Sequence, residues 1–209
     1  MYMPRAHKEE RVTVLHKFIE DQPFASLITV GSSGLFASHI PMVLEPNGAM
    51  GQLRGHISRA NTQWRDYNPS VEALAIFSGP QHYITPNWYP EKQETAKVVP
   101  TWNYVVVHAY GYLKVIEDGE WLMTHLASLT NIHEADSPVP WKIGDAPADY
   151  IAALTRGIVG LEMTIERLEG KWKVSQNRSE QDRDGVAKGL AELKTAESLE
   201  MKALVERRD

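Results

Sequence analysis

The chain has 209 residues, of which 43% are hydrophobic and 23% are charged. These fractions are typical of a globular protein and exclude a chain that is disordered over most of its length. At roughly 150 residues per domain the length allows one or two domains, and we expect a single domain over residues 1–209. Cysteine is absent, which excludes disulfide frameworks, thiolate catalysis and cysteine-ligated metal centres.

The net charge is −5, from 22 basic and 27 acidic residues. Phosphate neutralisation supplies most of the affinity in nucleic-acid binding, so any DNA-binding face on this chain would be local. No apolar run approaches the roughly 18 residues of a membrane span, and residues 1–10 lack the apolar region of a signal peptide. We therefore expect a cytoplasmic protein without membrane contact.

The N-terminal part of the chain predicts one helix followed by a meander of strands. Residues 8–21 place their apolar side chains on one helical face. Apolar, β-prone runs separated by Gly, Pro and Asn turns predict strands over residues 24–30, 35–44 and 49–57. Such a meander is not stable alone, so further strands are expected.

The middle of the chain contains these further strands. The run Val71–Ser78 is typical of a strand buried on both faces, and Gly79-Pro80 is expected to end it before a return strand. Residues 86–100 predict a loop. The other predicted strands are the return strand 81–85, the longest strand Trp102–Ile116, and Ile158–Leu168, after which Gly170 is expected to turn the chain.

Helical patterns predict helices from residue 119 to about 130, over 147–156, and from about 180 to 207. The order of a helix, several antiparallel strands and then helices predicts an α+β fold and not a βαβ fold. We expect the strands to form a closed or nearly closed antiparallel β-barrel with flanking helices. The C-terminal helix is a candidate for contact with a partner subunit.

The segment Leu53–Arg65 predicts an anion site where a strand runs into a short helix. Ser58 is predicted to be the N-cap of that helix, whose free backbone N–H groups and dipole favour a negative charge. Arg59 adds a planar cation suited to phosphate, and His56 and Asn61 add hydrogen-bond donors. The alternative is an ordinary helix start with solvated arginines.

A second candidate is the polar pair Ser38 and His39 within the apolar strand over residues 35–44. Strand alternation places the two side chains on opposite faces, and each needs a hydrogen-bond partner if it is buried. Either His39 is satisfied by a backbone carbonyl, or the pair lines one cleft with Ser58 and Arg59.

The third candidate is an aromatic cluster that could hold a flat ligand. Stacking on an aromatic wall adds about 0.5–1.5 kcal/mol beyond the burial of area. The alternative is packing in the core or at a dimer interface. The cluster contains His82, Tyr83, Trp88, Tyr89, Trp102, Asn103 and Tyr104.

Several common sites are absent from the sequence. It contains no Gly-x-Gly-x-x-Gly motif, no phosphate-loop lysine motif, no Gly-x-Ser-x-Gly elbow and no His-Glu-x-x-His motif. We find no helix-turn-helix pattern, predict no metal site and assign no catalytic residue.

A series of short motifs runs through the chain, namely Pro23-Phe24-Ala25, Ala37-Ser38-His39-Ile40-Pro41, Gly55-His56, Arg59-Ala60-Asn61, Gln63-Trp64-Arg65, Trp88-Tyr89, Val99-Pro100-Thr101-Trp102-Asn103-Tyr104, His133-Glu134, Gly170-Lys171-Trp172-Lys173 and Ser175-Gln176-Asn177-Arg178. In these motifs the sequence resembles the PaiB-like family over residues 1 to about 195. It departs from the family pattern at two positions, where His7 replaces a frequent aromatic residue and Thr62 replaces a common proline.

The resemblance implies an antiparallel split β-barrel of the FMN-binding type, in a homodimer with the flavin cleft at the subunit interface. It implies that Ser58 and Arg59 hold the FMN phosphate and that Ser38 and His39 face the ring or the ribityl chain. Trp88 or Trp102 would come from the partner subunit. Together with His56 and Asn61, these are the residues that we expect to bind the cofactor.

Members of the PaiB-like family are described as FMN-binding negative transcriptional regulators, so the resemblance implies a repressor that acts on DNA directly or through another regulator. Two alternatives remain open. One is a flavin-dependent oxidoreductase acting on a small molecule, with His39 and His56 as candidate proton donors. The other is a haem-binding split-barrel protein.

Overall fold

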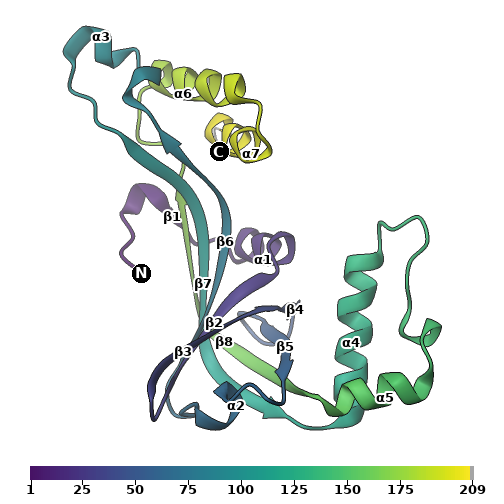
Figure 1. Ribbon diagram of the computed structural model, residues 1–209. Helices are drawn as coiled ribbons and strands as arrows, with labels where there is room; N and C mark the ends of the chain where they lie inside the picture. Colours follow the sequence, from purple (N-terminus) through teal and green to yellow (C-terminus); the bar gives the residue numbers. More distant parts are fainter. Residues whose placement is uncertain (208–209) are drawn as a thin grey trace. The chain divides into compact units, whose positions relative to one another are not determined.

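The computed structural model describes residues 1–207, and an eight-stranded sheet is its framework. The sheet order is β3-β2-β6-β7-β8-β5-β4, and β1 pairs with β8 outside this path (Figure 1). The strands are β1 Lys8–Glu9, β2 Phe24–Gly31, β3 Gly34–Pro41, β4 Val43–Glu45, β5 Gln52–Ser58, β6 Ala73–Ile84, β7 Thr101–Ile116 and β8 Ile158–Lys173.

Helices precede, interrupt and follow these strands, so the α+β prediction with an antiparallel sheet is confirmed. None of the helices within residues 1–207 has the length and hydropathy to cross a membrane. The α-helices are α1 Val12–Asp21, α2 Gln63–Asp66, α3 Glu91–Thr95, α4 Gly119–Glu134, α5 Ala148–Arg156, α6 Glu180–Leu193 and α7 Ala196–Glu206, and the 3₁₀ helices are η1 Arg5–His7, η2 Pro86–Trp88 and η3 Ile143–Asp145.

The chain divides into two compact units. The barrel unit contains residues 16–77 and 108–168, and the terminal unit contains residues 1–15, 78–107 and the chain from Glu169 on. Strands β6, β7 and β8 contribute residues to both units. The single domain over residues 1–209 therefore stays a prediction.

The barrel unit closes because the two ends of its sheet are adjacent in the chain. β3 and β4 stand at opposite ends of the sheet order, yet Met42 alone separates them. β3 consequently lies against β5, where a Cβ on Gly55 would be 3.1 Å from Ile40 Cδ1. The interior is apolar and fully buried, with Leu27, Leu53, Leu161 and Met163 each 0% exposed.

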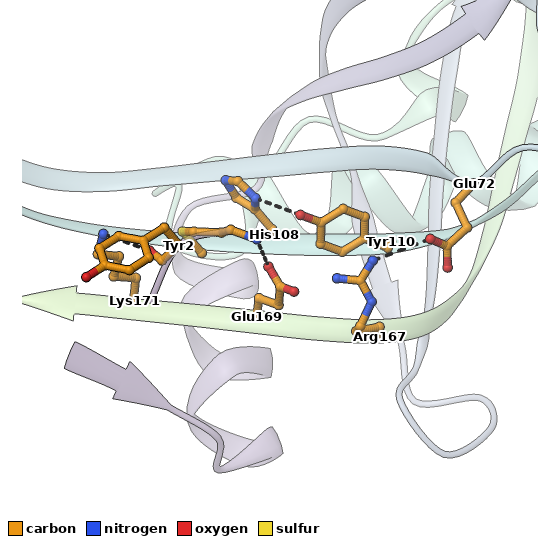
Figure 2. A network of polar contacts seen from close by, with 8 residues as sticks. Tyr2, Glu72, His108, Tyr110, Arg167, Glu169 and Lys171 are labelled. Carbon is orange, nitrogen blue, oxygen red and sulfur yellow. Dashed lines mark hydrogen bonds and ion pairs between the residues drawn. The ribbon is translucent and has the colours of Figure 1, made fainter. Parts of the chain in front are cut away.

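Polar contacts connect β8 with neighbouring segments of the chain (Figure 2). In the barrel unit, the Arg167 guanidinium lies 3.6 Å from the centre of the Tyr110 ring and 3.4 Å from Glu72. In the terminal unit, Lys171 Nζ donates to Tyr2 O at 3.1 Å, and the Met1 ammonium pairs with Glu169. The latter contacts attach the first residues of the chain to β8.

The terminal unit packs α6 against α7 and against η2 (Figure 1). A Cβ on Gly189 would overlap the Trp88 ring, so a glycine is required where α6 meets η2. The sequence pattern predicts one C-terminal helix over about 180–207, but the structure has two. Lys194 takes a left-handed φ of 58° that ends α6, and Thr195 accepts a hydrogen bond from Ser198 N at the start of α7.

Two predicted strand breaks are wrong. β6 runs through Gly79-Pro80, because its register with β2 ends at Phe77 and the proline lies where no β2 partner needs its missing N–H. β8 runs through Gly170, which pairs with Glu9 and whose missing side chain leaves room for Leu15. The strand predicted over 35–44 is instead divided at Met42 into β3 and β4.

Candidate functional site

A cavity of about 950 Å³ in the barrel unit brings together five of the polar residues singled out in the sequence. They come from β3, from β5 and from the turn that follows β5. The rest of the wall is largely apolar and includes side chains of α4, α5 and the segment between them. The polar residues are Ser38, His39, His56, Ser58 and Asn61, and the apolar wall includes Ile57, Leu126, Trp141, Ile151, Leu154 and Ile158.

Ser38 and Asn61 form a fixed polar corner of this cavity. Asn61 Nδ2 donates to Ser38 Oγ at 2.9 Å, and Asn61 Oδ1 accepts from Gln63 N at 2.9 Å. Both ends of the Asn61 amide are therefore used within the protein. The Ser38 hydroxyl accepts from Asn61 and keeps its own hydrogen for a ligand, since a hydroxyl carries one donor and two acceptor positions.

His39 is exposed and is held by a neighbouring strand. Its Nδ1 lies 2.9 Å from Ser26 Oγ on β2, and its ring stacks near Phe24 at 6.5 Å between centroids. The hydrogen-bond partner of His39 is thus a serine hydroxyl, and not the backbone carbonyl considered as an alternative from the sequence. Ser38 and His39 both line the cavity, although strand alternation places their side chains on opposite faces of β3.

The prediction that Ser58 caps a helix is wrong. β5 ends at Ser58, and the short helix α2 begins five residues later at Gln63, with Thr62 before it. In the turn between them, Arg59 N donates to Gly157 O at 2.8 Å and Asn61 N donates to Ser58 O at 2.9 Å. These amide hydrogens already have partners, so the turn is not a helix-dipole site for an anion.

The guanidinium of Arg59 is bound within the barrel unit as well. Its Nε donates to Arg156 O at 3.1 Å, its Nη2 donates to Ile158 O at 3.3 Å, and its Nη1 pairs with Glu117. Arg59 lines an adjoining cavity of about 920 Å³, not the cavity that contains Ser58. The two cavities share the lining residues Ile143, Ile151 and Thr155.

A histidine that the sequence analysis missed lies directly behind His56. His56 Nδ1 and His125 Nε2 are 3.1 Å apart, and the His125 ring stacks on Trp121 with centroids 5.3 Å apart. Helical spacing could have indicated that His125 is buried, since it follows Leu122 by three residues on the buried face of α4.

Both members of this pair are neutral at pH 7. Burial lowers the pKa of His56. Burial, with smaller contributions from His56 and Arg54, lowers the pKa of His125 to about 4. Since a buried N–H without a partner is rarer in proteins than an unfilled acceptor, we assign the shared hydrogen to His125 Nε2. The proton of neutral His56 then resides on Nε2.

Trp88 and Trp102 belong to the terminal unit. Trp88 is half-buried against α6, and its ring lies 6.3 Å from that of His82. Trp102 is 48% exposed, and its Nε1 donates to Gln81 Oε1 at 3.1 Å. The contribution of either ring to a flavin site stays a prediction.

Comparisons with known proteins agree with this fold. Residues 1–167 match the family described as "Putative FMN-binding domain". The chain is 36% identical over 231 residues to an uncharacterized protein of Emericella nidulans, covering 93% of this chain and 92% of that protein. It is 29% identical over 208 residues to the protease synthase and sporulation protein PAI 2 of Bacillus subtilis, covering 99% of this chain and 97% of that protein.

Among solved structures, a flavocytochrome of Azotobacter vinelandii has a similar fold, with a TM-score of 0.61 at 10% identity. The similarity covers 82% of this chain and 72% of that one. At this identity it bears on the fold alone and confirms the split-barrel prediction. The family match and the near full-length similarity to PAI 2 place the chain, as its motifs predict, in the PaiB-like family of FMN-binding-domain proteins.

Proposed function

We propose that the protein binds FMN in the 950 Å³ cavity of the barrel unit and acts as a PaiB-like transcriptional repressor. The observation that supports this most strongly is the convergence of five polar residues from β3, β5 and the turn after β5 on a cavity with otherwise apolar walls. Small-molecule sites typically combine apolar walls with a few such polar groups in a volume of about 300–1,000 Å³.

The donors in this cavity suit the flavin ring. The Ser38 hydroxyl and His56 Nε2 can donate to the oxygen and nitrogen acceptors along one edge of the ring, and Leu126, Leu154 and Ile158 can pack on its faces. Because the pKa of His56 is lowered by burial, His56 donates as a neutral ring and brings no charge into the cavity.

The phosphate would lie at the boundary with the adjoining cavity, between the Ser58 hydroxyl and the Arg59 guanidinium. Arg59 is tied to Glu117 by an ion pair, so a phosphate would compete with this carboxylate for the same cation. When bound, FMN supplies reversible electron and hydride transfer. The residues of this chain would orient it, shield it from water and hold a proton at His56 Nε2.

We further propose that the protein forms a homodimer and that its interface covers the helical segment from α4 to α5. This segment exposes several large apolar side chains, and clustered exposed apolar residues mark interaction sites. A second copy of the chain would bury them and could supply the partner subunit's Trp88 or Trp102 to the flavin. The residues are Ile132, Val139, Trp141, Tyr150 and Leu154, with exposed fractions of 53%, 84%, 43%, 57% and 54%.

The similarity to the protease synthase and sporulation protein PAI 2 supports a regulatory role, and we propose that this role is repression in the cytoplasm. Since the net charge is −5, we propose that the protein acts through another regulator or through a local basic patch. A gel-shift assay with DNA from the upstream region of its own gene distinguishes the two. Direct binding gives a shift that weakens as salt rises, and indirect action gives none.

The second candidate function is a flavin-dependent oxidoreductase. It is supported by the His56–His125 pair, which can hold or move a proton beside the cavity. Oxidation of NAD(P)H by the FMN-loaded protein would favour this function over repression alone.

An absorption spectrum and an FMN titration test the central proposal. We expect flavin bands in the purified or FMN-loaded protein and quenching or a shift of flavin fluorescence at micromolar protein. A Soret band would indicate haem instead. Absence of flavin uptake by the folded protein would reject the FMN assignment.

A further inference from the structure

The terminal unit contains a much smaller cavity, of about 70 Å³. Every residue that lines it carries a polar side chain, and the residues come from the first turn of the chain, the segment from η2 to β7, and the end of β8 with the turn after it. The proposed function makes no use of this cavity. Its lining residues are His7, Tyr89, Thr101, Asn103, Lys173, Ser175, Asn177 and Arg178.

Two polar atoms around this cavity are buried without a hydrogen-bond partner. Tyr89 is 2% exposed and its hydroxyl is unpaired, and His7 is 9% exposed with Nδ1 unpaired, each among the residues that the structure describes. Folded proteins pair nearly all of their buried polar groups, and an exception calls for a missing partner. Because His7 and Tyr89 both line this cavity, a single guest that reaches both atoms would satisfy both.

The charges around the cavity select an anion. Lys173 Nζ donates only to the neutral oxygens of Thr101 and Trp102, and the Arg178 guanidinium stacks on the Tyr89 ring at 4.7 Å from its centre. Arg178 reaches Glu91 at 3.9 Å, the limit of an ion pair. None of the described lining residues is acidic.

The pKa values of Lys173 and His7 reflect the neighbouring cations. Burial lowers the pKa of Lys173, and the neighbouring Lys171 and Arg178 lower it further. Burial also lowers the pKa of His7, and Lys173 and Lys171 add to this effect, whereas a hydrogen bond from the His7 ring to Gln176 opposes it. Burial raises the pKa of the Tyr89 hydroxyl, with Asp182 adding to the rise and the nearby Arg178 and Ser175 opposing it, so the hydroxyl stays protonated and able to donate.

Hydrogen bonds within the protein hold the wall of the cavity. Asn103 is 1% exposed and donates from Nδ2 to Ser175 Oγ at 2.9 Å. Ser175 holds a left-handed φ of 64°, and Gln176 Oε1 accepts from Val174 N at 2.8 Å in the same turn. His7 is placed by the contacts of the first residues with β8, including the hydrogen bond from Lys171 to Tyr2 O (Figure 2).

We propose that this cavity binds a small oxyanion, namely a phosphate or carboxylate group. Its oxygens would accept hydrogen bonds from the Tyr89 hydroxyl and the His7 ring and face the cations Arg178 and Lys173. A cavity of about 70 Å³ admits the group itself but not a nucleotide or a flavin. The site is therefore separate from the proposed FMN cavity and does not depend on it.

Thermal unfolding of the full-length, FMN-free protein tests this proposal, with inorganic phosphate as the probe and sodium chloride at equal ionic strength as the reference. A ligand that binds only the folded state stabilises it in proportion to the logarithm of its concentration. We expect the unfolding temperature to rise with phosphate and not with chloride. A parallel titration with acetate shows whether the site also takes a carboxylate group. A phosphate titration at saturating FMN shows whether the site instead takes the phosphate end of a larger ligand.

Tyr89→Phe is the decisive variant because it removes only the unpaired hydroxyl. Without phosphate its stability should equal or exceed that of the wild type, since a buried unsatisfied group is lost. With phosphate its affinity should fall by about tenfold or more, because a hydrogen bond to a charged group is lost. Tyr112→Phe, which alters an exposed tyrosine of the barrel unit, should leave the affinity unchanged.

Arg178→Gln provides a second variant whose loss of affinity does not depend on Tyr89. The proposal is overturned if neither phosphate nor acetate stabilises the wild type more than chloride does, which is the result for a cavity that holds only water. It is also overturned if Tyr89→Phe and Arg178→Gln both keep wild-type affinity, or if saturating FMN abolishes the response to phosphate.

Discussion

His56 and His125 share a hydrogen bond of 3.1 Å between Nδ1 of the first and Nε2 of the second. His56 belongs to the lining of the large cavity, and His125 is 2% exposed with its ring against Trp121. The helix α4 thereby sets the orientation and the tautomer of a side chain on β5. His125, which does not line the cavity, thus determines which nitrogen of His56 can donate to a ligand.

From the His56–His125 pair we predict that the free energy of unfolding falls in mild acid. The pKa of His125 is about 4 in the folded protein and about 6.5 in the unfolded chain. The unfolded chain therefore binds more protons between these values, and the free energy of unfolding falls as the pH falls from 6.5 towards 4. The full difference is on the order of 3 kcal/mol.

Urea unfolding of the wild type and of His125→Asn between pH 4.5 and pH 7 measures this effect. We expect the pH dependence to become flatter in the variant, while the control His133→Asn, at the end of the same helix, keeps the wild-type slope. An unchanged slope in His125→Asn would show that His125 is not the group that titrates.

Arg59 and Glu117 should change FMN affinity in opposite directions. Arg59→Gln removes the cation proposed to face the phosphate, and we expect the Kd to rise about tenfold, at the lower end of what a charge-assisted hydrogen bond contributes. Glu117→Gln removes the carboxylate that competes for Arg59, so the Kd should fall.

Flavin fluorescence titration gives all of these Kd values. Arg65→Gln is the matched control, because Arg65 stacks on Trp64 and lines neither cavity. If neither Arg59→Gln nor Glu117→Gln changes the Kd, the phosphate does not bind at the boundary between the two cavities.

The proposed homodimer predicts that a charge on α4 dissociates it. Ile132 is 53% exposed and lines neither cavity. Ile132→Glu should convert a dimer into a monomer, measured by size-exclusion chromatography with light scattering, because a buried unpaired carboxylate opposes association. Leu199→Glu, at a 47% exposed position of α7, should leave the dimer intact. A wild-type monomer at micromolar concentration would contradict the proposal directly.

Gly111 is predicted to be irreplaceable in the barrel. A Cβ at this position would overlap Thr164 O on the neighbouring strand, where only backbone can yield. Gly111→Ala should lower the free energy of unfolding by at least about 3 kcal/mol. Gly144→Ala, with open space around the new Cβ, should stay within about 0.5 kcal/mol of the wild type in the same urea titration.

Most of the fold could be predicted from local patterns. β7 begins one residue before its predicted start and ends where expected, and α5 is offset by a single residue. Two of the errors lie at glycine and proline, which predict turns when read in isolation. Pro80 is tolerated because β2 no longer pairs beside it, and Gly170 serves the packing of Leu15. Both reasons depend on segments distant in the sequence.

The sequence by itself allowed Ser38 and His39 to be grouped with Ser58 in one cleft, because these residues lie on strands that follow one another in the chain, but Arg59, grouped with them, lines the adjoining cavity. Only the tertiary structure decided which groups these residues bind. Arg59 is tied to a carbonyl 99 residues away, and His56 to a histidine 69 residues away. Local spacing determines the face that a side chain occupies on its own strand or helix, whereas the packing of distant segments selects its hydrogen-bond partner.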